Sequence, residues 1–327
     1  MTTQNVSEFL AERVRAVEEA AATKFHEEET ALQLMLALPL AERFEQLHEG
    51  TYPMSNALAR GGLFAAVKDR DRVMLRDKVV RSLSNYSVRF TGDQLNQSDL
   101  DVLMAVICEA REQPMGNRVH FTAYRMLKRM GWTHNTDSYA RLRECVKRLQ
   151  RAQVTVEFHR DNKRNLRWTG SFINDFIEAD ERPLGIEHDA KLEKSHWNLN
   201  LDERLSSLFA NDEVTLCVWH IRTQLDGRMP LAQFLHSFYS THEFPLPISV
   251  GKLRELSESV EKNASNFIYR LTRALDKLVE IGFLKSYAID GNPHAKDSLS
   301  KIVKVIRVPP SVLAERARER LRSRLPR

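Results

Sequence analysis

Cysteine is scarce in this sequence, and long apolar runs are absent. The three cysteines, Cys108, Cys145 and Cys217, lie far apart in 327 residues, and each falls within an apolar-patterned segment. This spacing argues against a disulfide framework and a paired-cysteine zinc site, so we expect reduced cysteines in the core. No apolar run approaches the ~18 residues of a membrane span, and the N-terminus lacks the basic start and apolar core of a signal peptide. We therefore expect a cytoplasmic protein with no membrane segment.

Motifs for several kinds of catalysis are also absent. The sequence contains no G-x-x-x-x-G-K-[ST] phosphate-binding loop and no H-E-x-x-H zinc motif. Carboxylates gather at Asp175, Glu178, Asp180 and Glu181, a grouping that could bind a metal for nuclease chemistry. However, no histidine or further carboxylate is spaced to complete such a site, and a solvated loop explains the charges. We expect a protein that is not an enzyme, with no catalytic residue, no metal site and no cofactor.

The charge that is present is unevenly distributed. The net charge is only +5, and 28% charged and 42% apolar residues are ordinary for a globular protein. The length of 327 residues is enough for two or three domains. Residues 1–30 carry seven acidic and three basic side chains, whereas residues 301–327 carry nine basic and two acidic ones. A polyanionic partner is therefore expected for the body and the C-terminal tail.

Residues 120–158 carry the most informative pattern in the chain. They read as a helix, a short turn at Gly131 and Trp132, a second and strongly basic helix, and a strand whose apolar residues alternate. This is the order of a winged helix-turn-helix unit, in which the second helix contacts DNA.

The same pattern occurs a second time, 129 residues further along (253 minus 124, for example). The apolar positions Tyr124, Leu127, Leu142, Val146 and Leu149 recur as Leu253, Leu256, Leu271, Leu275 and Leu278, and Arg125 and Arg141 recur as Arg254 and Arg270. We therefore predict an α+β fold, a tandem winged-helix protein with an N-terminal helical arm. The expected domains are an arm at 1–50, winged-helix domains at 51–210 and 211–310, and a basic tail at 311–327.

The first unit offers a basic helix, from Thr136 to Ala152, and a hairpin. The predicted DNA contacts on the helix are Arg141, Arg143, Lys147, Arg148 and Arg151. Strands at Val154–Phe158 and Leu166–Phe172 flank a basic turn, which we interpret as the wing. The predicted wing contacts are Arg160, Lys163 and Arg164.

The second unit carries more of the residue types that read bases. The predicted contacts on its helix, from Asn263 to Gly282, are Lys262, Asn266, Tyr269, Arg270, Arg273 and Lys277, and those of its wing loop are His294 and Lys296. Asn and Arg make bidentate pairs with adenine and guanine edges, so sequence specificity is expected to depend on this unit. The arginine-rich tail that follows either adds phosphate contacts or stays solvated.

An apolar segment at residues 31–40 stands in a polar region. One interpretation is an apolar turn that docks on the first domain. Alternatively, the segment fits Q-x-x-L-x-L, a pattern that resembles the sliding-clamp ligands of bacterial replication proteins, with the Gln amide making hydrogen bonds and the leucines filling an apolar pocket. The predicted clamp contacts are Gln33, Leu34, Leu36 and Leu38.

The chain resembles the TrfA family of plasmid replication initiators. The segments that carry the resemblance are YSVRFTGDQL at 86–95, GNRVHFTAYRMLKRMGW at 116–132, RLRECVKRLQ at 141–150 and FYSTHEFPLPISVGKLREL at 238–256. The resemblance implies binding to direct repeats (iterons) in double-stranded origin DNA and opening of an adjacent AT-rich segment, which makes single-stranded origin DNA a further candidate partner. It also implies contacts with the host sliding clamp, replicative helicase and initiator, and a monomer-dimer equilibrium. The family's clamp motif is Q-L-S-L-F, and here Met35 and Ala37 replace its Ser and Phe.

Two other functions compete with this interpretation. A winged-helix transcriptional regulator would use the same reading helices without replication partners. The alternative from another class is a DNA strand-transfer enzyme with a tyrosine nucleophile, for which His220-Ile221-Arg222 and scattered tyrosines are the candidate residues. Such an enzyme needs several cations converging on one phosphate, and the sequence shows no spacing of that kind.

Overall fold

The protein has a mixed α+β fold, as expected from the sequence. The computed structural model describes residues 50–80, 86–113, 117–158, 166–179, 195–202, 205, 208–209, 214–225, 227–291 and 298–322. The chain divides into two compact units, residues 1–38 and 39–327, and all described residues belong to the second unit. Within the described ranges, no helix is long and apolar enough to cross a membrane.

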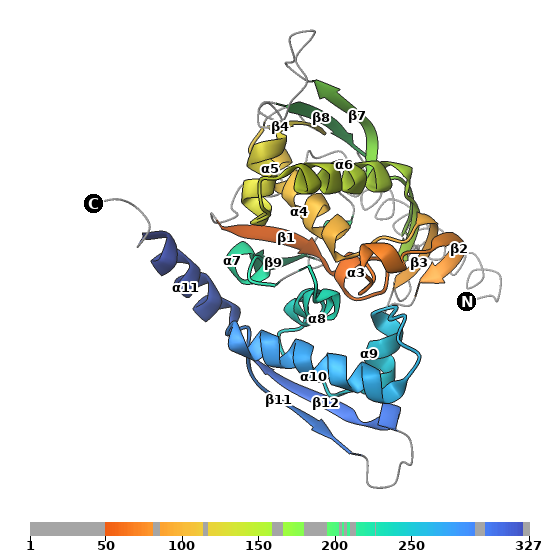
Figure 1. Ribbon diagram of the computed structural model, residues 1–327, viewed down its shortest axis with the longest axis vertical. Helices are drawn as coiled ribbons and strands as arrows, with labels where there is room; N and C mark the ends of the chain where they lie inside the picture. The colour runs from red at the N-terminus through yellow and green to blue at the C-terminus, as the bar shows by residue number, and fades with distance from the viewer. Residues whose placement is uncertain are drawn as a thin grey trace, which may run out of the picture. The chain divides into compact units, whose positions relative to one another are not determined.

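A buried helix, α4 (Gln97–Arg111), lies at the centre of the first half (Figure 1). It begins with a capping box, in which Asn96 Oδ1 accepts a hydrogen bond from the Ser98 amide and Asp99 Oδ2 accepts one from the Asn96 amide, both at 2.9 Å. Side chains from Leu100 to Ala110 are buried all around the helix. A helix that is buried on every side must be covered on every side, and here α5, α6, β1 and β4 pack against it.

The expected helix pair follows α4 and the short strand β4 (Arg118–Thr122). Helix α5 (Ala123–Met130) is capped by the Thr122 hydroxyl and ends at Gly131, whose φ of +69° favours glycine. Helix α6 (Thr136–Arg151) is capped by Asn135. The apolar face of α6 is buried, as its periodicity predicted; its buried residues are Tyr139, Leu142, Cys145, Val146 and Leu149.

The hairpin interpreted as the first wing extends a sheet whose first two strands precede α4 in the chain. Its strands β5 (Gln153–Phe158) and β6 (Leu166–Gly170) continue a four-stranded sheet that begins with β2 (Met74–Val80) and β3 (Tyr86–Asp93), in the order β2-β3-β5-β6. Val154 and Val156 are buried there beside β3, which explains their apolar alternation.

Another hairpin joins the strand that precedes the helix pair. Strand β4 pairs with β8 (His196–Leu201), and β8 pairs with β7 (Ile173–Ala179), giving the order β4-β8-β7. The sequence analysis expected Asp175 and Glu178 in a solvated loop, and this was wrong because both lie on β7. On β7 the apolar Ile177 is 60% exposed and the acidic Glu178 is half-buried, so the strand does not alternate between buried apolar and exposed polar residues.

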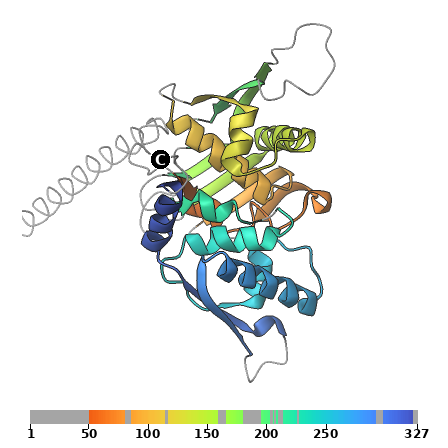
Figure 2. The ribbon, with the colours of Figure 1, turned by 60° about the vertical axis from the view of Figure 1, so that its left-hand side comes forward.

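The second half repeats this order of elements. It contains α8 (Pro230–Ser240), β10 (Ile248–Ser249), α9 (Val250–Leu256), α10 (Ala264–Glu280), β11 (Leu284–Asp290) and β12 (Ile302–Arg307). The strand order is β10-β12-β11, which matches β4-β8-β7 position by position. Figure 2 shows the β11–β12 hairpin beside α10. Each half has its own apolar core.

Corresponding residues of the internal repeat are separated by two different distances along the sequence. Leu142, Val146 and Leu149 of α6 correspond to buried residues of α10 at the predicted distance of 129 (271 minus 142). In the preceding helices the capping residues Thr122 and Ser249 are only 127 apart (249 minus 122). Tyr124 is therefore half-buried, and Met126 takes the place that corresponds to buried Leu253.

The connection between the halves is built from short elements. Strand β1 (Thr51–Ser55) leads into α3 (Asn56–Ala59) and pairs with β9 (Val214–Val218), which is followed by α7 (Trp219–Arg222). Helix α11 (Pro310–Arg322) follows the second half. All three cysteines are buried, as expected.

Candidate nucleic-acid interface

Helix α10 presents polar and basic side chains on the face opposite its buried leucines. Asn263 Oδ1 caps the helix by accepting a hydrogen bond from the Asn266 amide at 3.0 Å. Asn266 and Arg273 are exposed, Tyr269 is 63% exposed, and the Arg270 side chain is 58% exposed. Because the opposite face fills the core of the second half, this face of α10 is held outward on a fixed helix.

Weak surface contacts hold the side chains of this face. The Arg273 guanidinium lies 5.8 Å from the centre of the Tyr269 ring, and Arg270 forms an ion pair of 3.4 Å with Glu261. Lys277 is paired with Glu280 at 2.6 Å. Exposed ion pairs of this kind contribute little free energy, so a phosphate or a base edge can replace the carboxylate as the partner.

A groove of about 590 Å³ runs beside this face. One wall is α10, with Asn266, Tyr269, Arg270 and Arg273. The lining residues outside α10 are 66–68, 70–71, 228–232 and 259–261. The sequence interpretation missed the basic residues among them, Lys68, Arg70 and Arg228. The first two stand in the run Lys-Asp-Arg-Asp-Arg, where alternating charges give almost no local excess of positive charge.

The basic residues of α6 are bound mostly to partners within the protein. The Arg148 side chain is only 14% exposed, and its guanidinium contacts Asp99 Oδ1 at 2.9 Å. Burial by itself lowers the pKa of Arg148, but the Asp99 carboxylate more than offsets this and raises it. Arg143 pairs with Glu178 of β7. These arginines were predicted to flank an outward, DNA-contacting face, and the structure instead uses them to fasten α6 to α4 and β7.

Arg141 also faces inward. Its guanidinium stacks on the Trp132 ring at 4.3 Å and donates a hydrogen bond to Ser98 Oγ. Of the predicted contacts on α6, Arg151 is exposed and Lys147 forms an exposed pair with Glu144 at 3.4 Å. The outward basic face of α6 is therefore smaller than the sequence suggested, and that of α10 is intact.

Several predicted contacts lie outside the described residues. They are Arg160, Lys163 and Arg164 of the β5–β6 turn, His294 and Lys296 of the β11–β12 loop, and Gln33, Leu34, Leu36 and Leu38 of the clamp-like segment. Lys262 is described and exposed, and its carbonyl accepts a hydrogen bond from Arg254.

The acidic residues near β7 take part in structural contacts. Glu178 binds Arg143, and Asp175 Oδ2 accepts a hydrogen bond from Asn200 at 3.3 Å. Among the residues that the structure describes, no three His, Cys, Asp or Glu side chains are grouped so that they could hold a metal ion.

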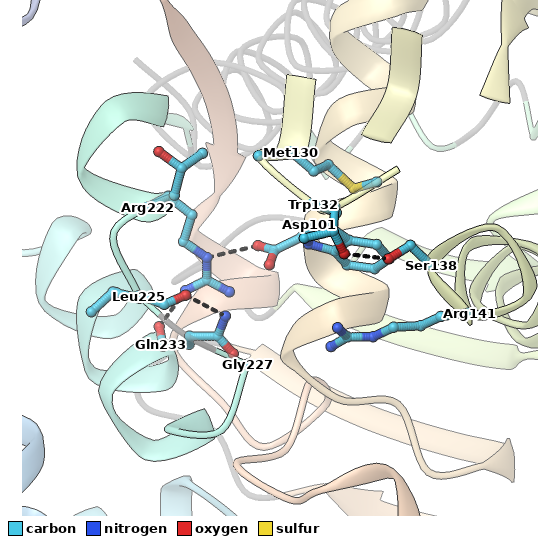
Figure 3. Close-up of a pocket in the computed structure, with 12 residues that line it drawn as sticks. Asp101, Met130, Trp132, Ser138, Arg141, Arg222, Leu225, Gly227 and Gln233 are labelled. Carbon is cyan, nitrogen blue, oxygen red and sulfur yellow. Dashed lines mark hydrogen bonds and ion pairs between the residues drawn. The ribbon is translucent and has the colours of Figure 1, made fainter. Parts of the chain in front are cut away.

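The junction between the halves is organised around Arg222 (Figure 3). This side chain is 2% exposed, and its Nε donates a hydrogen bond to Asp101 Oδ1 of α4 at 2.7 Å. The other guanidinium nitrogens donate to the Gln233 carbonyl (2.6 Å) and to Gln97 Oε1 (2.9 Å). Arg222 is therefore a buried structural cation, and the His-Ile-Arg sequence does not present this guanidinium to a substrate phosphate.

Comparison with known proteins identifies the family. A family model described as the TrfA protein matches residues 3–296. The chain belongs to the TrfA family. A curated relative, the plasmid replication initiator protein TrfA of Escherichia coli, is 24% identical over 247 residues, which cover 74% of this chain and 61% of that relative. The matched region thus spans less than two thirds of the relative's length.

Two solved structures are similar to parts of this TrfA-family chain. Domains 2 and 3 of RctB match with a TM-score of 0.50 at 14% identity, over 77% of this chain and 98% of that chain. The Pi initiator protein in complex with iteron DNA gives a TM-score of 0.45 at 10% identity, over 65% of this chain and 94% of that chain. The RctB match shows a shared arrangement of elements across both halves.

Proposed function

We propose that this protein is a plasmid replication initiator that binds direct repeats, or iterons, in the double-stranded DNA of a plasmid origin. Membership of the TrfA family and the name of its curated relative support this role. The observation that carries the binding mode is the exposed face of α10, where Asn266, Tyr269 and Arg270 project from a helix whose other side is fixed in the core. Asn and Arg are the side chains that pair with adenine and guanine edges.

Each half of the protein is proposed to be a winged-helix unit. Both halves contain a helix, a short strand, two helices and an antiparallel hairpin that pairs with the short strand. In this assignment α6 and α10 are the helices that enter the major groove, and the β7–β8 and β11–β12 hairpins are the wings. Because α6 holds many of its arginines in internal ion pairs, α10 is expected to supply most of the base recognition.

The replication partners are proposed from family membership alone. They comprise the host sliding clamp, the replicative helicase, the host initiator and opened single-stranded origin DNA. The protein itself is proposed to be cytoplasmic and to exist in a monomer-dimer equilibrium. Deleting Gln33 to Leu38 is expected to abolish replication while repeat binding stays intact. If the deletion leaves replication unchanged, the clamp-like segment has no role in it. The protein is proposed to act by binding and recruitment and not by catalysis.

A footprint over the origin of the replicon that encodes the protein tests the central proposal. We expect protection of several evenly spaced direct repeats, without ATP, by the purified protein. A single protected inverted repeat at a promoter would instead indicate a transcriptional regulator. Protection of no site would contradict both functions.

Substitutions on α10 test the proposed reading face. Asn266→Ala and Arg270→Ala are each expected to weaken binding to the repeat by about 10-fold to 100-fold, with a much smaller effect on random DNA, because a lost bidentate base contact costs about 1–3 kcal/mol. Arg118→Ala removes an exposed cation from β4 and serves as the control. Equal losses on repeat and random DNA would show that these residues meet only phosphate. Binding constants from fluorescence anisotropy provide the measurement.

A further inference from the structure

The groove beside α10 has a second wall that belongs to another part of the chain. Lys68 and Arg70 come from the segment that follows α3, and Arg228 comes just before α8. All three side chains are exposed. A helix that enters a major groove must have the phosphodiester strand at the edge of that groove running alongside it. This groove lies alongside the proposed reading face, where such a strand would pass.

The charge of the groove suits a polyanion. Its lining contains five basic residues and two acidic ones, a net charge of +3; they are Lys68, Arg70, Arg228, Arg270 and Arg273, with Asp71 and Glu261. Both acids contact one of these arginines, Asp71 with Arg70 at 3.7 Å and Glu261 with Arg270 at 3.4 Å. An incoming phosphate therefore meets an excess of cations on both walls.

The positive lining continues beyond α10. Lys68 and Arg228 also line a neighbouring hollow of about 350 Å³, whose other lining residues are Asp69, Asn96, Arg141 and Gly227, so that three cations face one carboxylate. A Cβ atom on Gly227 would lie 3.0 Å from Arg141 Nη2, so glycine permits the close approach of that guanidinium. The two hollows together extend from the face of α10 to a residue of α6.

The wall that carries Lys68 and Arg70 is firmly anchored. The Ala66 amide donates a hydrogen bond of 2.8 Å to the Ser257 carbonyl, which follows α9 in the second half. Asn96 Nδ2 donates to the Val67 carbonyl (3.1 Å) and to Asp69 Oδ1 (2.9 Å), and Arg72 pairs with Asp69 at 2.7 Å. A preorganised backbone places the two cations at little entropic cost on binding.

We infer that Lys68, Arg70 and Arg228 hold the DNA strand that borders the major groove entered by α10, and that they form a backbone clamp opposite the reading face. This inference rests on the proposed function, because it requires α10 to meet duplex DNA. Lys and Arg contacts to phosphate add affinity without sequence information. The clamp therefore strengthens binding to all duplexes and fixes the position of the strand against which α10 reads.

The double variant Lys68→Gln/Arg228→Gln tests the inference, since these two residues line both hollows. Affinity is measured for a repeat duplex and a random duplex between about 50 and 200 mM salt, a range over which phosphate contacts dominate. We expect a loss of roughly tenfold or more on both duplexes, and a salt slope lower in magnitude by about 2, because each phosphate contact contributes about 0.9. The control Arg76→Gln/Arg118→Gln removes the same charge from exposed positions on β2 and β4 and should keep the slope of the unmodified protein.

The outcomes separate the inference from the proposed function. The proposed backbone clamp would be overturned if the double variant Lys68→Gln/Arg228→Gln kept the salt slope of the unmodified protein. The initiator proposal would still stand, provided that the unmodified protein prefers the repeat duplex to the random duplex. No preference for the repeat in the unmodified protein would overturn the initiator proposal itself. Ethylation interference gives a second readout: neutralising the phosphates at the edge of the α10 site should inhibit the unmodified protein more than the double variant. An equal effect on both proteins would contradict the inference.

Discussion

His236 is an ionisable residue enclosed in the core of the second half. It is 1% exposed, its ring lies 4.6 Å from that of Phe283, and its Nδ1 has no hydrogen-bond partner among the described residues. Burial lowers the pKa of His236 well below its ordinary value of 6.5, and the positive charges of Arg222 and Arg307 lower it further. The folded protein therefore holds this imidazole neutral under conditions in which the unfolded chain takes up a proton.

The stability of the protein should depend on pH through this residue. Because the pKa of His236 is lower in the folded protein than in the unfolded chain, protonation of this residue leaves the free energy of unfolding unchanged above pH 6.5. The free energy of unfolding decreases as the pH falls below 6.5 toward the pKa of the folded state, by at most about 1.4 kcal/mol per pH unit. His236→Gln should flatten the pH dependence of the unfolding free energy between pH 7 and pH 5, measured by urea titration. A smaller dependence should remain, because burial also lowers the pKa of His242. If the unfolding free energies of the unmodified protein and of His236→Gln change with pH in parallel, His236 is not responsible for the pH dependence.

At the scale of elements, the cations of α6 include one that forms a buried ion pair and one that forms an exposed ion pair. Asp99, 0% exposed in α4, contacts Arg148 of α6 at 2.9 Å and Arg72 at 2.7 Å. Arg148→Ala should lower the free energy of unfolding by about 2–4 kcal/mol, because it leaves a buried carboxylate with one guanidinium in place of two. Lys147→Ala, which removes an exposed pair on the same helix, should change stability by less than about 0.5 kcal/mol. Equal urea midpoints for the two variants would mean that Arg148 acts as a surface cation.

Sequence periodicity predicted these helices well because it reports local geometry. The apolar spacing of α6 and α10 located their buried faces, and the outward face of α10 agrees with the side chains named for it. Gly131 was identified as the end of α5 because a left-handed cap favours glycine. Within a helix, the sequence alone decides which side chains share a face.

Pairing between distant segments was not predictable in the same way. The β5–β6 hairpin follows α6 directly and alternates, so it resembled a wing, yet its partner is β3, more than 60 residues earlier in the chain (154 minus 90 for one aligned pair). The partners of Arg143 and Arg148 lie on β7 and α4, and no local pattern indicates such contacts. The basic wall at Lys68 and Arg228 likewise forms only when the chain folds.

At the scale of the whole molecule, Arg222 joins the two proposed reading units. It links Asp101 of α4 in the first half to the Gln233 carbonyl of α8 in the second half (Figure 3). It also donates a hydrogen bond to Gln97 of α4. Helix α8 in turn packs against α10. Two reading helices held at one separation match one spacing of half-sites on DNA, so this buried network favours a fixed repeat length.

Arg222→Gln should therefore destabilise the junction between the halves. Removing the guanidinium takes away the ion-pair partner of the buried Asp101 carboxylate, a loss that typically costs about 3–5 kcal/mol. We expect unfolding in urea to change from one transition to two, as each half has its own core. The neutral double variant Asp101→Asn/Arg222→Gln should recover part of the loss. If the single variant unfolds in one transition at the midpoint of the unmodified protein, Arg222 does not hold the halves together.

The pH dependence of the same variant distinguishes a lost charge from lost packing. Burial already raises the pKa of Asp101 above its usual value, although Arg222 opposes the shift. Without Arg222 the pKa should rise further, so the folded variant binds a proton more tightly than its unfolded chain does. A raised folded pKa adds stability as the pH falls, and Arg222→Gln should therefore regain stability relative to the unmodified protein as the pH falls from 7 toward the ordinary carboxyl value of 3.8. A constant difference across that range would mean that Arg222 contributes by packing alone and that the charge of Asp101 does not oppose folding.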